Sequence, residues 1–158
     1  MWQKILTILG SILITACQPG LSTKSAPVTV SEIEGPKSER IATVTKLLVT
    51  QEPLPSPLQN AYFLEEQIGD NQLGPSDYVS FGMLEIKPDD LSAWRGKLLP
   101  LKVQPDYVAP QASPDWWVNV AEYSSLELFK LRPYTQRIHG WIGIDAKTNK
   151  IYIYTFTT

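Results

Sequence analysis

The sequence is poor in the residues that build disulfides and common metal sites. Its 158 residues include one cysteine, Cys17, and one histidine, His139. A disulfide needs two cysteines, and common structural zinc sites use four Cys or His ligands, so the chain supplies neither. We therefore expect no metal and no cofactor, and we expect packing alone to stabilise the fold.

The sequence also lacks an excess of positive charge and the short motifs of several enzyme classes. It carries 14 Lys and Arg residues against 16 Asp and Glu residues, for a formal net charge of −2. Nucleic-acid binding depends on Lys and Arg side chains that neutralise phosphates, so we expect no nucleic-acid partner. Neither a glycine-rich phosphate loop nor a Gly-x-Ser-x-Gly motif occurs.

No apolar run reaches the length of a membrane-spanning helix, which takes about 20 residues. The N-terminal run from Ile5 to Ala16 follows the positive charge of Lys4 and ends in small side chains. This order is typical of a secretory signal. We therefore predict that residues 1–16 are a signal peptide, with an uncleaved N-terminal helix as the alternative.

The end of this segment, Ile14-Thr15-Ala16-Cys17, resembles the lipobox of bacterial lipoproteins, in which an aliphatic and two small residues precede a cysteine. The resemblance is confined to the N-terminal segment. It implies that the Cys17 thiol carries a diacylglycerol, that cleavage removes residues 1–16, and that the new amino group is acylated. Two or more acyl chains hold a protein stably on a membrane.

The resemblance also implies a location. Such a protein belongs to the cell envelope, where the lipid on Cys17 anchors it to a membrane and the domain faces the periplasm or the exterior. Gln18 follows the cysteine in place of aspartate, which resembles the signal for transfer to the outer membrane in cells with two membranes. The alternative is an ordinary secretory signal in which Cys17 has no role.

Residues 17–37 are expected to form the lipidated N-terminus and a flexible tether. This stretch is rich in Ser, Thr, Pro and Gly and shows no apolar periodicity. A flexible chain of about twenty residues reaches roughly 25 Å. Plain disorder without a length requirement is the alternative. Residues 38–158 then form a single globular domain.

The domain is predicted to belong to the α+β class. Strands are expected where aromatic and β-branched residues gather or alternate with polar ones, over 61–68, 78–86, 126–131, 138–144 and 151–156. The last two form a C-terminal β-hairpin, and both faces of its second strand are apolar, so that strand is covered on both sides or central. We predict an antiparallel sheet of four to five strands with one or two helices on one face.

Two segments carry helical patterns. Residues 88–98 begin with a proline and two aspartates, which suit a helix N-terminus, and carry an apolar stripe at helical spacing. Residues 38–48 carry a similar stripe, but their β-branched side chains leave a strand as the alternative. The prolines at 53, 55 and 57 exclude a helix and predict an extended connector.

A long loop supplies the candidate binding residues. Four prolines between Leu99 and Pro114 exclude a helix there, and loops of that length often bind ligands. Trp116 and Trp117 follow, and adjacent side chains diverge, so at least one is expected to be partly exposed. Exposed aromatic faces stack on sugars, which makes these tryptophans and Tyr107 candidate contacts for a glycan or a protein. Packing of the tryptophans beneath the loop is the favoured alternative.

Catalytic patterns are sparse, and His139 is the one side chain that ordinarily titrates near neutral pH. On a strand, His139 would share a face with Arg137 and Trp141, and Asp145 is a candidate to orient its ring. A lone strand histidine is usually structural, so His139 is a weak catalytic candidate. The sequence therefore favours a non-catalytic envelope lipoprotein that binds a protein partner or cell-wall glycan. The alternative is a small envelope hydrolase that uses His139 with a carboxylate.

Replacement of Cys17 by serine tests the lipoprotein assignment. Serine offers no thiol for the thioether to the lipid, so Cys17→Ser is expected to keep its signal peptide and to incorporate no labelled fatty acid. Gel mobility and fatty-acid labelling in cells that express the full chain measure both effects. Normal processing of the variant would contradict the assignment.

Overall fold

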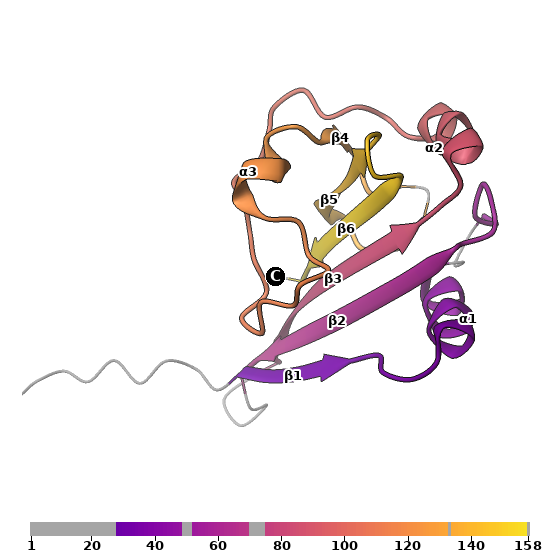
Figure 1. The fold of residues 1–158 in the computed structure, drawn as a ribbon. Helices are drawn as coiled ribbons and strands as arrows, with labels where there is room; N and C mark the ends of the chain where they lie inside the picture. Colours follow the sequence, from indigo (N-terminus) through magenta and orange to yellow (C-terminus); the bar gives the residue numbers. More distant parts are fainter. Residues whose placement is uncertain (1–27, 49–51, 70–74, 133, 158) are drawn as a thin grey trace, which may run out of the picture.

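The computed structural model describes residues 28–48, 52–69, 75–132 and 134–157 (Figure 1). Its strands are β1 (Val28–Glu32), β2 (Asn60–Ile68), β3 (Asp77–Glu85), β4 (Glu127–Phe129), β5 (His139–Asp145) and β6 (Lys150–Phe156). Its helices are α1 (Lys37–Leu48), the 3-10 turn η1 (Pro88–Asp90), α2 (Leu91–Lys97) and α3 (Val120–Tyr123). The strands form one antiparallel sheet in the order β1-β2-β3-β6-β5-β4. The α+β class is confirmed, but the sheet has six strands instead of four to five.

Strand β1 is the element that the sequence pattern does not predict. We expected residues 17–37 to form a tether, yet Val28–Glu32 pairs with β2 along its whole length. Its alternating Val and Thr favour an edge strand, although its Thr and Ser content is also typical of a linker. The ordered domain therefore begins before residue 38, which corrects the expected boundary. Cys17 and the predicted signal peptide lie outside the described residues.

The sheet separates two apolar cores. On one face lie α1 and α2, whose buried residues include Val44 and Trp94. The other face is covered by the long segment 98–126, which contains α3, and its core includes Trp117 and Tyr152 (Figure 1). Two helices thus share one face, as predicted, and the segment rich in proline covers the other.

Strand β6 lies in the middle of the sheet, between β3 and β5. Ile151 and Ile153 face the core beneath α1, whereas Tyr152 and Tyr154 pack on the opposite core. Both faces of this strand are therefore covered, as its apolar pattern predicts.

Both expected helices are confirmed. Helix α1 buries Val44 and Leu48, and the packing of this stripe outweighs the weak helix propensity of its β-branched residues. The second pattern forms η1 and α2, where Trp94 is fully buried and its Nε1 donates to Oγ of Ser56 at 3.1 Å. That bond holds the proline-rich connector against the helix. None of the described helices is long and apolar enough to cross a membrane.

Gly140 in β5 is required by the backbone, so its replacement is expected to destabilise the fold. Its φ is +128°, and an added Cβ would lie 1.9 Å from the carbonyl oxygen of Tyr154. We predict that Gly140→Ala loses at least about 1–3 kcal/mol of unfolding free energy, measured by urea denaturation.

The matched control is Gly96→Ala in α2, where an added Cβ meets no heavy atom within 4 Å. This variant is expected to gain up to about 1 kcal/mol from helix propensity. Equal unfolding free energies for the two alanine variants would contradict the role given to Gly140.

Candidate functional site

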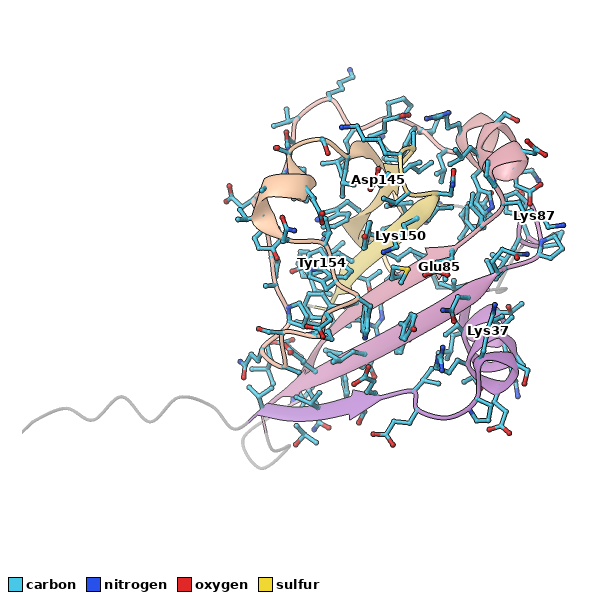
Figure 2. The ribbon with its side chains drawn as sticks, in the orientation of Figure 1. Lys37, Glu85, Lys87, Asp145, Lys150 and Tyr154 are labelled. Atoms are coloured by element: carbon cyan, nitrogen blue, oxygen red, sulfur yellow. The ribbon has the colours of Figure 1, made fainter. Side chains whose placement is uncertain are left out.

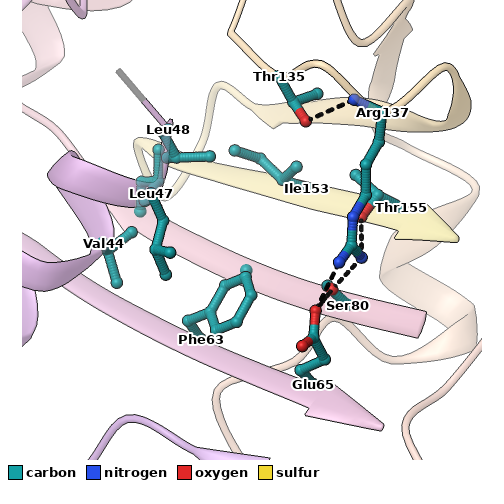
Figure 3. A pocket seen from close by; sticks show the side chains of 12 residues that line it. Val44, Leu47, Leu48, Phe63, Glu65, Ser80, Thr135, Arg137, Ile153 and Thr155 are labelled. Carbon is teal, nitrogen blue, oxygen red and sulfur yellow. Dashed lines mark hydrogen bonds and ion pairs between the residues drawn. The ribbon is translucent and has the colours of Figure 1, made fainter. Parts of the chain in front are cut away.

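A pocket of about 260 Å³ opens between α1 and the face of the sheet (Figure 3). Val44, Leu47 and Leu48 of α1 supply its apolar wall. Phe63 of β2 and Ile153 of β6 contribute to its floor. Leu47 is 47% exposed while it lines the cavity, so the pocket is reachable from solvent.

The pocket exists because a glycine stands in the middle of its floor. The antiparallel register places Gly82 of β3 between Phe63 and Ile153. A Cβ at this position would meet nothing closer than Cβ of Ile153, at 3.7 Å, which is ordinary van der Waals contact. The contrast is Gly143 in β5, where an added Cβ would lie 2.7 Å from Cδ1 of Leu126. A neighbour fills the space above Gly143, whereas Gly82 lines the pocket and a Cβ there would fit in ordinary van der Waals contact.

One end of the pocket is polar. Glu65, Ser80 and Thr155 lie side by side in the register of β2, β3 and β6. Arg137, from the segment before β5, reaches across all three (Figure 3). Its Nη1 donates to Oγ of Ser80 at 2.5 Å and to Oγ1 of Thr155 at 3.1 Å. Its Nη2 donates at 2.6 Å to Oε2 of Glu65, which also accepts from Oγ of Ser80 at 2.7 Å.

These four side chains, here called the polar cluster, keep hydrogen-bonding capacity for a further group. A guanidinium carries five N–H donors, and the cluster uses only part of them. Within the part of the chain that the structure describes, Nε of Arg137 and Oε1 of Glu65 have no partner. The two side chains are 30% and 29% exposed, so the ion pair lies at the pocket edge. It offers both donors and an acceptor to a ligand.

The position of Arg137 corrects one expectation. A regular strand would place Arg137, His139 and Trp141 on the same face. His139 and Trp141 do share a face, where their rings pack against Phe156 and Tyr154. Arg137 turns to the opposite face, because β5 begins only at His139 and the chain is irregular before it. The alternation of side chains between the two faces of the sheet therefore does not extend back to Arg137.

His139 does not belong to the pocket. Its ring is exposed and stacks on Phe156 with the centroids 5.2 Å apart. Asp145, the expected orienting group, lies at the other end of β5, beside Lys150 (Figure 2). Among the described residues, no hydrogen bond or ion pair joins His139 to a carboxylate. The structure does not bring the suggested catalytic pair together.

The carboxylate of Asp145 closes the turn between β5 and β6. It accepts from the backbone N–H of Lys147 at 2.9 Å and from Oγ1 of Thr148 at 2.6 Å. Burial alone would raise the pKa of Asp145, but the hydrogen bonds from Thr148 and Lys147 hold that pKa below its ordinary value. Asp145 is therefore a charged acceptor with a structural role.

Two of the three candidate aromatic residues have structural contacts. Trp117 is 8% exposed, and its Nε1 donates to the carbonyl of Val108 at 3.1 Å. The Tyr107 hydroxyl donates to the carbonyl of Val118 at 2.8 Å, and burial raises the pKa of Tyr107. These hydrogen bonds join residues 107–108 of the proline-rich segment to residues 117–118, above the sheet. Packing beneath the loop, the favoured alternative, is thus confirmed for Trp117.

Trp116 is half-buried, which confirms that at least one of the two tryptophans is partly exposed. Its ring stacks on Tyr62 with the centroids 5.6 Å apart and an interplanar angle of 19°. Its Nε1 donates to Oε1 of Glu32 at 3.0 Å. The structure brings the three aromatic candidates to one groove of about 410 Å³, which Tyr152 also lines.

Comparisons with known proteins add no relative. No protein-family model matches the sequence, and neither a curated protein nor a solved structure matches it. Within the described ranges, no group of three or more His, Cys, Asp or Glu side chains could hold a metal ion. The functional argument therefore rests on the geometry of the pocket.

The pocket residues are not among those that the sequence pattern singles out, although two signals point to them. Glu65, Ser80 and Thr155 occupy inward positions of largely apolar strands, and polar groups on a buried face need partners. Gly82 interrupts an apolar strand, and a glycine there indicates close approach or open space. Neither signal assigns a partner until the strand register is known.

The open space above Gly82 predicts an unusual gain of stability. Gly82→Ala is expected to raise the unfolding free energy by about 0.4–1 kcal/mol, because alanine restricts the unfolded chain and its Cβ has room in the fold. Gly143→Ala is expected to lower it, because Leu126 must move. Urea unfolding followed by tryptophan fluorescence compares the two variants with wild type. A destabilised Gly82→Ala would show that the space is not free.

Proposed function

We propose that this protein is a non-catalytic binding module of the cell envelope, with its binding site in the pocket between α1 and the sheet. The pocket would take a small ligand or the end group of a larger one. The observation that carries the proposal is the open space above Gly82 in the middle of the sheet. A concave, mostly apolar cavity with a few convergent polar groups is the usual form of a ligand site.

The pocket works against the stability of the domain, which supports a functional reason for it. Glycine inside a strand costs roughly 0.5–1 kcal/mol relative to alanine. An empty apolar space also gives up the contacts that atoms across it would make. The half-buried pair of Arg137 and Glu65 also carries a desolvation cost, which opposes its attraction. Local features that lower stability in this way are typical of functional sites.

The polar cluster supports binding more than catalysis. A serine nucleophile needs a base to take its proton and a free lone pair to attack a substrate. Oγ of Ser80 donates to the carboxylate of Glu65, but the guanidinium of Arg137 donates to Oγ of Ser80 and also holds that carboxylate in an ion pair. His139 lies on the opposite face of the sheet. Among the described residues, the hydrolase alternative therefore has no assembled pair of His139 and a carboxylate.

The lipid expected on Cys17 is part of the proposal. A tethered domain stays close to the bilayer, and the tether raises its effective concentration toward ligands and partners at the membrane. In a cell with two membranes we propose the outer membrane, because Gln18 follows the cysteine. Since β1 begins at Val28, residues 28–32 belong to the sheet and not to the tether expected over 17–37.

The groove beside Trp116 is a second candidate contact, for a cell-wall glycan or a protein partner. Its support is the half-exposed indole stacked on Tyr62, which presents a flat aromatic surface. Capture on purified cell-wall glycan with wild type and Trp116→Ala tests this contact. Trp117 stays unchanged in that test, because its removal would open the core.

Blocking the pocket is expected to remove a ligand that copurifies with the protein. The full-length chain is extracted from membranes with a styrene–maleic acid copolymer, because a detergent would compete for an amphipathic pocket. Bound molecules are then identified by mass spectrometry for wild type, Gly82→Leu and the control Gly96→Ala. The leucine fills the floor of the pocket, whereas Gly96 lies in α2, away from the pocket lining.

We expect one molecule to be enriched with wild type and Gly96→Ala and to be lost from Gly82→Leu. Leu47→Trp fills the pocket from the α1 side and serves as a second block if the leucine variant does not fold. Equal recovery of the same molecules from wild type and a folded blocked variant would contradict the proposed site.

A further inference from the structure

We propose that the ligand of this pocket is an uncharged amphiphile, with an apolar body under α1 and a head group that both donates and accepts hydrogen bonds at Arg137 and Glu65. The inference rests on the proposed function and adds the chemical class of the ligand. It follows from the shape of the cavity, the charge of its polar end and the hydrogen-bonding groups left over there.

The body of the ligand must be apolar. Val44, Leu47 and Leu48 line the cavity on the helix side, and Phe63 and Ile153 line it on the sheet side. A polar group placed among these side chains would lose its hydrogen bonds to water and gain none from the wall. The polar groups of the lining gather at one end (Figure 3). An amphiphile therefore fits in one orientation, with its head at the polar cluster.

The polar end carries one positive and one negative charge in direct contact. Nη2 of Arg137 lies 2.6 Å from Oε2 of Glu65. An anionic head group would be attracted by the guanidinium but repelled by the carboxylate, and a cationic head group would meet the reverse. The other two members of the cluster, Ser80 and Thr155, are uncharged. The net charge of the cluster is therefore zero, which favours a neutral head group.

The unpaired hydrogen-bonding atoms of the polar cluster match a head group that both donates and accepts hydrogen bonds. Nε of Arg137 is a donor, and Oε1 of Glu65 is an acceptor, and neither has a partner among the described residues. A carboxamide carries both kinds of group, an oxygen that accepts hydrogen bonds and an N–H that donates them. A carboxylate can only accept, and an ammonium can only donate. Each would leave one of the two groups unpaired.

The size of the cavity limits the ligand. The pocket has a volume of about 260 Å³. Pockets for drug-sized ligands start at about 300 Å³. The pocket therefore suits a small molecule or a single chain of a larger amphiphile.

Three probes that differ only in the head group test the inference. Octanamide, octanoate and octylammonium are titrated by calorimetry into the full-length chain held in copolymer-extracted lipid particles. Particles of the same lipid without the protein measure the partition of each probe into lipid, and their signal is subtracted from that of wild type and of Gly82→Leu. We expect wild type to bind octanamide at least about tenfold more tightly than either charged probe, as the loss of one hydrogen bond to a charged group predicts.

Two variants are expected to change which probe the pocket prefers, each toward a head group of the opposite charge. Glu65→Gln leaves the guanidinium without its counter-charge, so the preference is expected to move to octanoate. Arg137→Gln leaves the carboxylate, so the preference is expected to move to octylammonium. Circular dichroism checks that each variant is folded. A change of the preferred probe in only one of the two variants would still show that the head group lies at the polar cluster.

The outcomes separate this inference from the proposed function. A wild-type preference for octanoate or octylammonium, lost in Gly82→Leu, would overturn the neutral head group while the pocket remains the binding site. Binding of octanamide that Gly82→Leu leaves unchanged would overturn both. If none of the probes binds wild type, the inference fails, and the copurified ligand decides whether the pocket binds a different class of molecule.

Discussion

The pairing of β3 with β6 is the constraint on which the rest of this structure depends. These strands are far apart in the sequence, and they meet in the middle of the sheet. Their register sets Gly82 opposite Ile153 and Ser80 opposite Thr155, so the open space and the polar end lie next to each other on one face. A slip of β3 by one residue would turn Gly82 and Ser80 toward the other core and remove the pocket.

The two faces of the sheet differ in what lies above their glycines. Under the proline-rich segment, the rings of Trp117, Trp141 and Tyr152 pack at centroid distances below 6 Å, and Leu126 occupies the space above Gly143. Such aromatic packing buries a large apolar area and stabilises a chain that has no intramolecular disulfide. The face under α1 keeps a cavity above Gly82. Both faces bury a core, and we infer that the face under α1 also supplies the binding pocket.

The amino-acid pattern predicts the elements whose signals are local. The C-terminal hairpin, α1 and α2 follow from apolar periodicity, and the central place of β6 follows from its two apolar faces. Strand β1 does not, because an edge strand of Val and Thr depends on its pairing with β2. The amino-acid pattern does not predict the pocket either. It depends on the register of three strands and on Arg137 turning away from the face of His139, and neither is encoded within one segment.

The most direct measurement of the central claim is a methyl-detected NMR titration of the full-length chain with small molecules extracted from the cell envelope. The pocket predicts chemical-shift changes centred on the methyl groups of the aliphatic residues that line it, Val44, Leu47, Leu48, Leu84 and Ile153. Leu126 and Leu128, which pack on the opposite core, serve as internal controls and should not change. Shifts centred on these two leucines, or spread evenly over both cores, would contradict a binding site under α1.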